Sequence, residues 1–257
     1  MTGEMYGMKL HIDTAPVWEA YRQDSECPLC LLQQRVESRS IDYFLGESVM
    51  EPDQRIEVNR KGFCSRHFKQ MYEAGNRLGL ALMTHTHLKE TIRSLREDVR
   101  LLNEATADEA ARSVVARLIG KRRASYGDLT AKWTDPGRDC VMCERIEKSM
   151  QRYCYTVAYL FGTDSAFAEA FERSKGMCLP HCAQTLEIAG EQLSGETLRR
   201  FVSSLTALQL ANLERLEGEV DWFTRKFDYR NDDKPWGNSR DAVKRAVNKL
   251  RSHTITD

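Results

Sequence analysis

The sequence predicts an all-α protein made of two tandem helical repeats, each tied together by a metal ion. Two copies of one motif carry this prediction, and each copy reads CxxC, then 33 or 34 residues, then Gly-x-CxxH. After each CxxH, apolar residues recur at steps of three and four over a long stretch, which is typical of a helix. Between these helices we find no convincing alternation of polar and apolar residues that would indicate a strand.

The two motifs contain eight candidate metal ligands. Cys140 lies 113 positions after Cys27, and Cys178 lies 114 positions after Cys64, so the copies match closely. Thiolates and an imidazole suit a zinc ion, and four such ligands complete a tetrahedron. We expect one site within each repeat and two metal ions in all. The first site would use Cys27, Cys30, Cys64 and His67, and the second would use Cys140, Cys143, Cys178 and His181.

Two other interpretations of the cysteines are less favoured. Buried structural thiols have no reason to repeat one spacing twice. A disulfide framework belongs mostly to short secreted chains, and residues 1–10 lack the charged-then-apolar order of a signal peptide. We therefore expect reduced thiols that hold metal in the cytoplasm.

Length and composition narrow the range of functions. The chain has 257 residues, with 30% charged and 41% hydrophobic residues, and a net charge of zero. This length is enough for one large domain or two small ones. A neutral chain offers no overall field that attracts nucleic acid or an anionic membrane. No apolar run approaches the length of a membrane span.

The first repeat is expected over residues 1–120. A helix should follow the first CxxC and end at Pro52. After the first CxxH, apolar residues from Phe68 to Leu102 form a long helical seam of coiled-coil type. Residues 121–139 contain two glycines and a proline and are expected to connect the repeats.

The second repeat is expected over residues 140–226 and follows the same plan. A helix after the second CxxC, a short helix around Phe167 and a long helix from about Gly195 are predicted in turn. Residues 227–257 should form a C-terminal arm and a short amphipathic helix, and docking of this arm on the body is favoured over a free arm that binds a partner. We expect the repeats to pack as a pseudo-symmetric bundle, because neither half alone offers its long helix enough core.

Three further residues are candidates for binding a cofactor or ligand. His85 lies on the first long seam, where it is either a hydrogen-bonded core histidine or a functional group in a cavity between the repeats. Cys154 and Cys182 lie outside the two motifs. Each is either a buried structural thiol or an extra sulfur beside the second metal.

The paired motifs, together with the closing segment KFDYR at 226–230 and Pro235-Trp236-Gly237, resemble a family of uncharacterised bacterial proteins. This domain of unknown function is found mainly in anaerobes such as clostridia, and the resemblance covers nearly the whole chain. It implies a metal-binding bacterial protein and no particular activity. An anaerobic setting would also permit an iron–sulfur cluster at cysteine-rich sites.

Three functions remain open from the sequence. The favoured one is a helical binding module with structural zinc, whose ligand or protein partner would occupy a groove between the repeats. The second is an iron–sulfur or other metal-dependent redox protein or enzyme. The third, a zinc-containing regulatory or nucleic-acid-binding protein, is disfavoured by the neutral charge. The chain has no phosphate loop, dinucleotide fingerprint, HExxH or serine elbow, so no catalytic residue is predicted.

Overall fold

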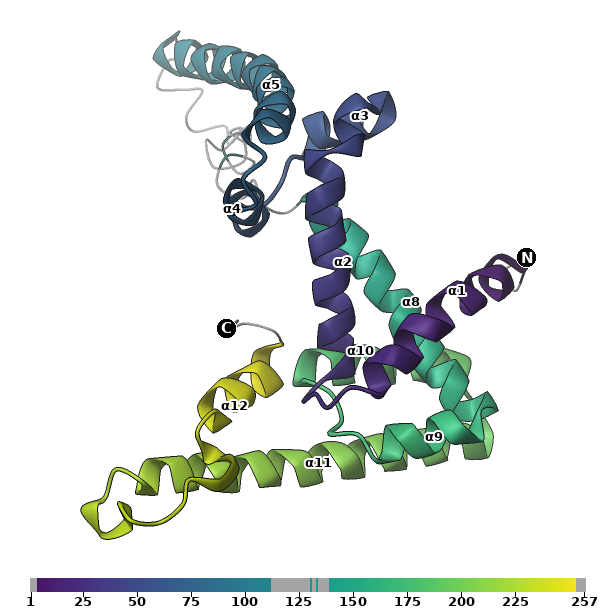
Figure 1. Ribbon diagram of the computed structural model, residues 1–257. Coiled ribbons are helices and arrows are strands. Elements are labelled where there is room, and N and C mark those ends of the chain that lie inside the picture. The colour runs from purple at the N-terminus through teal and green to yellow at the C-terminus, as the bar shows by residue number, and fades with distance from the viewer. Residues whose placement is uncertain (1–3, 112–129, 131–132, 134–138, 253–257) are drawn as a thin grey trace. The chain divides into compact units, whose positions relative to one another are not determined.

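The structure is a computed structural model and describes residues 4–111, 130, 133 and 139–252 (Figure 1). All regular secondary structure in these residues is helical, which confirms the predicted all-α class. Most of the predicted connector, 121–139, lies outside the described residues.

The chain divides into two compact units. Unit 1 contains Met1–Val36 and Ile146–Asp257, and unit 2 contains Glu37–Arg145. The boundaries fall inside helix α2 (Pro28–Leu45) and helix α8 (Val141–Thr163). Unit 2 is therefore inserted in the sequence of unit 1, and these boundaries differ from the predicted repeat boundaries at 120 and 140.

Unit 2 is built on a pair of helices, α3 and α5, that pack against each other. Pro52 supplies the first residue of α3, a position where its missing N–H costs nothing. Phe63 forms edge-to-face contacts with Phe44 and Phe68 beside this pair. The described elements of unit 2 between α2 and α8 are η1 (Glu47–Met50), α3 (Pro52–Lys61), α4 (Ser65–Glu73) and α5 (Arg77–Ala111).

Unit 1 is centred on an aromatic core. Phe161, Phe171 and Phe201 lie within 5.5 Å of one another by ring centroids and are almost fully buried. Helix α12 packs against α11 and α10, as Figure 1 shows, so the predicted docking of the C-terminal helix is correct. The remaining elements of unit 1 are α1 (Glu4–Tyr21), α9 (Ser165–Glu172), α10 (Leu179–Gln192), α11 (Gly195–Arg225), η2 (Tyr229–Asn231), η3 (Gly237–Ser239) and α12 (Ala242–Arg251).

The two sequence copies have their helices in the same order. Each CxxC is followed by a long helix, then a short one, then a helix that begins at the CxxH, and then the longest helix of the copy. In the first copy these are α2, α3, α4 and α5, and in the second they are α8, α9, α10 and α11. This common order supports the tandem repeat, which stays a prediction.

The predicted role of His85 in a cavity is wrong, because its side chain is exposed on α5. The face of α5 that packs in unit 2 carries Met83, which is fully buried, and His87, whose Nδ1 bonds to the carbonyl oxygen of Asn59 at 2.9 Å. Helix α3 covers this face. The apolar seam that contains His85 therefore lies on the other side of the helix.

Candidate metal centres

The eight predicted ligands form two groups, and each group combines the CxxC of one copy with the CxxH of the other. In each group the four ligand atoms lie within 4.8 Å of one another. The prediction of one site within each repeat is therefore wrong, although each group lies within one compact unit. We name them cluster A, in unit 1, which contains Cys27, Cys30, Cys178 and His181, and cluster B, in unit 2, which contains Cys64, His67, Cys140 and Cys143.

The local backbone explains why these motifs can converge on one point. Each CxxC straddles the start of a helix, α2 or α8, so its two sulfurs lie on the same side of the first turn. Each CxxH begins with the N-cap residue of α4 or α10, Cys64 or Cys178, in extended backbone conformation. The histidine three positions later then lies one turn along and faces the same way.

A glycine two positions before each CxxH makes the approach possible. Gly62 and Gly176 both have positive φ angles, 71° and 74°, which residues other than glycine rarely adopt. At Gly62 the space is also closed, because a Cβ atom would lie 2.5 Å from Nε2 of His87. Gly62 therefore allows both the positive φ angle and the close approach of the His87 ring just before the CxxH of cluster B.

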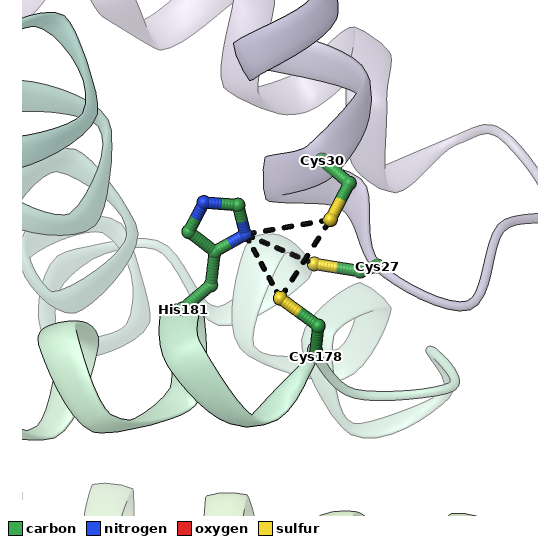
Figure 2. A group of neighbouring side chains, drawn as sticks. All are labelled: Cys27, Cys30, Cys178 and His181. Atoms are coloured by element: carbon green, nitrogen blue, oxygen red, sulfur yellow. Dashed lines mark hydrogen bonds between the residues drawn. The ribbon is translucent and has the colours of Figure 1, made fainter. Parts of the chain in front are cut away.

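Cluster A is fully buried and compact (Figure 2). Nδ1 of His181 lies 3.5 Å from the sulfur atoms of Cys27 and Cys30 and 3.2 Å from that of Cys178. The sulfur atoms of Cys30 and Cys178 are 3.6 Å apart. Four ligands at zinc–sulfur distances of about 2.3 Å would place sulfurs roughly 3.8 Å apart around a tetrahedron. The spacing in cluster A fits a single ion of this size.

Cluster B has similar spacing and is more open to solvent. Nδ1 of His67 lies 3.2 Å from the sulfur of Cys64, 3.3 Å from that of Cys140 and 3.5 Å from that of Cys143. The sulfurs of Cys64 and Cys143 are 3.8 Å apart. His67 is fully buried, whereas Cys143 is exposed. The eight cysteines are all free thiols, so no disulfide competes for these sulfurs.

A carboxylate orients the histidine of cluster B. Nε2 of His67, which points away from the sulfurs, lies 3.1 Å from Oε1 of Glu37. Arg66 binds the same oxygen at 2.8 Å. A carboxylate behind a ligating imidazole fixes its orientation and increases its basicity. The sequence alone did not reveal Glu37, which lies ten positions after Cys27 on α2, in the copy that supplies the CxxC of the other cluster.

Hydrogen bonds and burial set the protonation of cluster B without metal. Burial opposes ionisation of Cys140, but its hydrogen bond with His67 lowers the pKa of this thiol to about 6. Burial also opposes protonation of His67, yet hydrogen bonds with Cys140 and Glu37 raise its pKa to about 9. Burial and the nearby Cys140 thiolate raise the pKa of Cys143 to about 12. Without metal, the group thus holds one thiolate against one imidazolium at neutral pH.

Cluster A follows the same pattern with a different thiolate. Hydrogen bonds from Cys27 and Cys30 hold the pKa of Cys178 far below its usual range. Burial and the hydrogen bond with Cys178 raise the pKa of Cys27 well above its usual value. Burial opposes protonation of His181, but its hydrogen bonds with Cys178 and Cys30 raise its pKa to about 9. Protons must therefore leave both clusters when a metal binds.

Cys154 and Cys182 belong to neither cluster. Both side chains are buried in unit 1, and burial raises both pKa values, that of Cys154 to about 12. The sulfur of Cys154 lies 3.5 Å from Oε1 of Gln184, to which it can donate a hydrogen bond. Burial thus favours a protonated thiol at both positions at neutral pH, and a structural role for the two cysteines stays a prediction.

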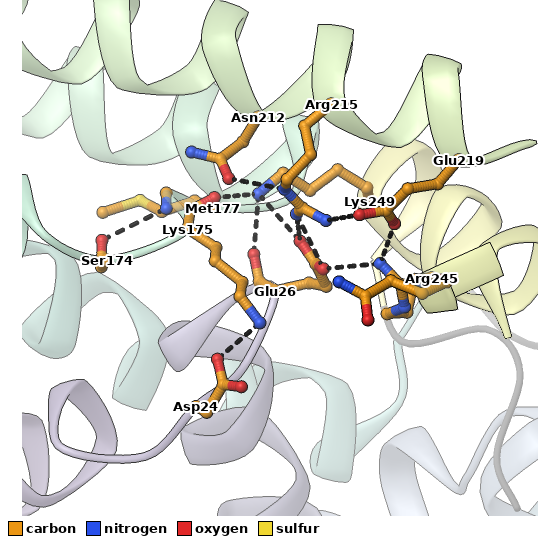
Figure 3. A network of polar contacts seen from close by, with 12 residues as sticks. Asp24, Glu26, Ser174, Lys175, Met177, Asn212, Arg215, Glu219, Arg245 and Lys249 are labelled. Atoms are coloured by element: carbon orange, nitrogen blue, oxygen red, sulfur yellow. Dashed lines mark hydrogen bonds and ion pairs between the residues drawn. The ribbon is translucent and has the colours of Figure 1, made fainter. Parts of the chain in front are cut away.

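A polar cavity of about 780 Å³ lies beside cluster A and is lined in part by Cys27 and Cys30. Its charged side chains are largely paired with one another, as Figure 3 shows. Glu26 accepts hydrogen bonds from Arg215 at 2.6 Å and from Arg245 at 3.2 Å. Arg245 also pairs with Glu219 at 2.5 Å. This network connects the loop before Cys27 to helices α11 and α12.

One buried lysine completes this network. Lys249 on α12 has almost no exposed surface, and its Nζ donates hydrogen bonds to the carbonyl oxygens of Glu26, at 2.8 Å, and Lys175. Glu26 immediately precedes the CxxC of cluster A, and Lys175 lies three positions before Cys178. Both peptide segments that enter cluster A are therefore bound to the C-terminal helix.

Among the described residues, no helix combines the length and apolar character needed to cross a membrane.

Comparison with known proteins places the chain in a family. The model of the family of unknown function DUF6062 matches residues 8–257. One relative, described as "Uncharacterized 23.9 kDa protein in xynA 3′ region" from Caldicellulosiruptor sp. (strain Rt8B.4), is 22% identical over 215 residues, which is 84% of this chain and 92% of the relative. No solved structure matches the chain. The resemblance to an uncharacterised family is thus confirmed, and the chain belongs to the DUF6062 family.

Proposed function

We propose that this protein binds one zinc ion in each cluster and that the helical body held together in this way acts as a binding module. The observation that carries the proposal is the convergence of three cysteines and one histidine, twice, within 4.8 Å. Thiolate and imidazole ligands at this spacing suit a tetrahedral zinc ion. The carboxylate of Glu37 behind His67 is the kind of support that ligating histidines have.

The geometry favours a single ion over an iron–sulfur cluster. In a polynuclear cluster the cysteine sulfurs bind different iron atoms, so the inorganic core holds them apart. Here the ligand sulfurs approach to 3.6 Å in cluster A and 3.8 Å in cluster B. That spacing leaves room for one ion between them.

A structural role is favoured over a catalytic one. Catalytic zinc usually has three protein ligands and an open position for water or substrate, whereas both clusters here supply four ligands. Cluster A is also fully buried. The function of the protein would then depend on its surfaces, and eight free thiols support the proposal of a reducing compartment such as the cytoplasm.

The metal is tested on protein purified without oxygen, by elemental analysis and an absorption spectrum. We expect two zinc ions per chain and a colourless protein. A brown protein with broad visible absorption and more than one iron atom per site would contradict the zinc assignment and favour the redox alternative.

The pairing of ligands is tested with two double variants that remove the same number of cysteines. Cys27→Ser with Cys178→Ser removes two ligands of cluster A, so about one zinc ion per chain should remain. Cys27→Ser with Cys64→Ser removes one ligand from each cluster, so both ions should be weakened and lost to a chelator. If the two motifs of each copy shared a site instead, the Cys27/Cys64 variant would be the one that keeps a full ion.

A further inference from the structure

Helix α5 has an apolar stripe that is exposed along much of its length. Its side chains expose 40–72% of their surface, whereas typical core residues expose less than a tenth. Contiguous exposed apolar surface of this kind usually marks an interface. The stripe consists of Leu78, Leu88, Ile92, Leu95 and Val99.

The stripe lies opposite the face that α5 uses within unit 2. The packed face carries Gly79, Met83 and His87, which follow each other at steps of four. At about 100° per residue, Ile92 lies roughly 180° around the helix from Met83. The packing of α3 on α5 therefore leaves the stripe uncovered, and α5 is apolar on two sides.

The stripe follows a heptad pattern whose residue types select two strands. If His85 occupies an a position, Ile92 and Val99 are the next a residues, and the d positions are Leu88, Leu95 and Leu102. Within parallel coiled coils, β-branched residues at a with leucine at d favour two strands. A single polar residue at an a position, as His85 is here, sets register in such pairs.

The charges beside the stripe favour parallel over antiparallel pairing. The e positions include Lys89 and Arg96, and the g positions include Thr84, Thr91 and Asp98. A parallel pair places e residues beside g residues of the partner helix, so no two cations face each other. An antiparallel pair would place the e positions of the two helices together, with Arg96 near Lys89 of the other copy.

The described part of the following segment does not cover the stripe. Nε1 of Trp133 donates a hydrogen bond to Oδ2 of Asp98 at 3.0 Å, which places this indole on one flank of α5. The neighbouring residue Val99 still exposes 44% of its surface. Asp98 lies about 100° around the helix from Val99, so Trp133 is beside the stripe and not on it.

We propose that α5 pairs in parallel with α5 of a second copy of this chain, through a two-stranded coiled coil over residues 85–102. The 18 residues span roughly 27 Å. The segment belongs to the longer helix α5, which already packs against α3. The proposal goes beyond the metal sites, since none of the stripe residues belongs to either cluster.

Sedimentation equilibrium on the zinc-loaded full chain tests the pairing. Wild-type protein should be a dimer at micromolar concentration. Ile92→Asp places a charge in the centre of the stripe and should raise the dimer dissociation constant by at least about a hundredfold, which corresponds to about 2.8 kcal/mol. Leu210→Asp is the matched control, because Leu210 is also exposed on a long helix, with 60% of its surface, and lies in unit 1. Both variants should retain the zinc content of the wild type.

A second variant should strengthen the dimer. His85→Val replaces the polar a residue with a β-branched one and should lower the dissociation constant about tenfold or more. A cross-linking experiment tests the parallel orientation. In a parallel pair, the thiol introduced by Val99→Cys should be joined to the same thiol of the second copy by a short bismaleimide, and the yield is compared with that of the wild type. In an antiparallel pair the two 99 positions would be roughly 18 Å apart and would not cross-link.

Three results would overturn the proposal. The wild type could be a monomer at about 100 µM. Ile92→Asp could leave the dimer intact. Val99→Cys could give no more cross-linked dimer than the wild type. The two proposals fail separately. A monomeric wild type that contains two zinc ions would contradict the pairing alone, and a dimer without zinc would contradict the metal function alone.

Discussion

The histidines of both clusters present Nδ1 to the sulfurs, and this choice determines what can support them. Nε2 of His67 is left to bind Glu37, while Nδ1 of the buried His181 ring lies against the sulfurs of cluster A. Cluster B is also the one with an exposed ligand, Cys143. A carboxylate behind an imidazole fixes the orientation of the ring and increases its basicity, and here it does so in the cluster that has the exposed cysteine.

At this scale the sequence was sufficient to select the residues that come together, and insufficient to say which motifs pair. All eight predicted residues lie in the two clusters. The two CxxC motifs are chemically equivalent, as are the two CxxH motifs, so spacing alone could not say which ones meet. The role of Glu37 could not be predicted either, because nothing in the sequence distinguishes this glutamate from others on helices until the fold places it behind His67.

Glu37→Gln should weaken metal binding at cluster B by about 10- to 100-fold, since the amide is a poorer acceptor than a carboxylate for the Nε2 proton of His67. Competition with a chromophoric chelator measures this change. Glu73→Gln is the control, because this residue lies on α4 in the same unit and makes only an exposed pair with Lys69. Equal zinc affinity in the two variants would show that Glu37 does not support the ligand.

Zinc binding at cluster B should become tighter as pH rises. Between about pH 6 and 9, His67, with a pKa of about 9, and Cys143, with a pKa of about 12, each carry a proton without metal. Cys140, with a pKa of about 6, is already ionised. At least two protons must leave, so affinity should rise about a hundredfold per pH unit.

The measurement is chelator competition from pH 6.5 to 8.5 on Cys178→Ser, a variant that retains an intact cluster B. The known protonation of the chelator is subtracted. A flat profile would mean that the ligands are already deprotonated in the metal-free protein, and would contradict the described hydrogen-bonded pairs.

Helix α12 connects the C-terminal segment of the chain to cluster A through Lys249. Its amphipathic pattern predicted a short helix that docks on the body, and most of its residues are partly exposed. Lys249 is nevertheless buried, as is Ala242. The segments entering cluster A present two carbonyl oxygens that need a donor, and Lys249 supplies it. Periodicity predicted that the helix exists and docks, but a buried lysine could not be inferred from a pattern that treats lysine as a surface residue.

Lys249→Met should destabilise unit 1 by about 2 kcal/mol or more, since it leaves two buried carbonyl oxygens without this donor. Lys244→Met on the same helix is the control, because Lys244 is only half-buried. Urea denaturation monitored by circular dichroism measures the difference. Equal midpoints for the two variants would show that the contacts of Lys249 contribute little.

Helix α5 illustrates the limit of pattern analysis for a whole element. The seam predicted from Phe68 to Leu102 is helical, but it is divided between two helices, α4, which ends at Glu73, and α5, which begins at Arg77. The sequence could not tell that Met83 and His87 form the packed face, because that depends on where α3 lies. His85 is exposed because α3 packs on the opposite face of α5.

The whole molecule consists of one unit inserted in another, and each unit contains one cluster. This organisation explains why the repeat boundaries predicted at 120 and 140 differ from the unit boundaries. The motifs repeat along the sequence, whereas the clusters combine segments from different copies. A repeat and a compact unit therefore need not coincide.

Loss of one metal should loosen one unit. Cys178→Ser removes a ligand of cluster A, and hydrogen exchange should accelerate in residues 12–36 and 146–252 far more than in residues 37–104. The reason is that structural zinc contributes folding free energy to the segments that it connects, on the order of 10 kcal/mol in small zinc domains. Cys64→Ser should show the reverse distribution. Uniform acceleration over the whole chain in both variants would argue against two separately stabilised units.

The nesting of the clusters also sets an order of events during synthesis. Cys27 and Cys30 leave the ribosome first, yet their partners Cys178 and His181 are made about 150 residues later. All residues of cluster B have been synthesised once the chain reaches Cys143. Cluster B can therefore assemble before the partners of Cys27 and Cys30 have been made. At elongation rates of 5–20 residues per second, the delay before those partners are made lasts roughly 7 to 30 seconds. During this interval the first CxxC of the nascent chain has no partner motif of its own, and correct assembly of cluster A depends on its thiols remaining reduced and separate from the CxxH of cluster B.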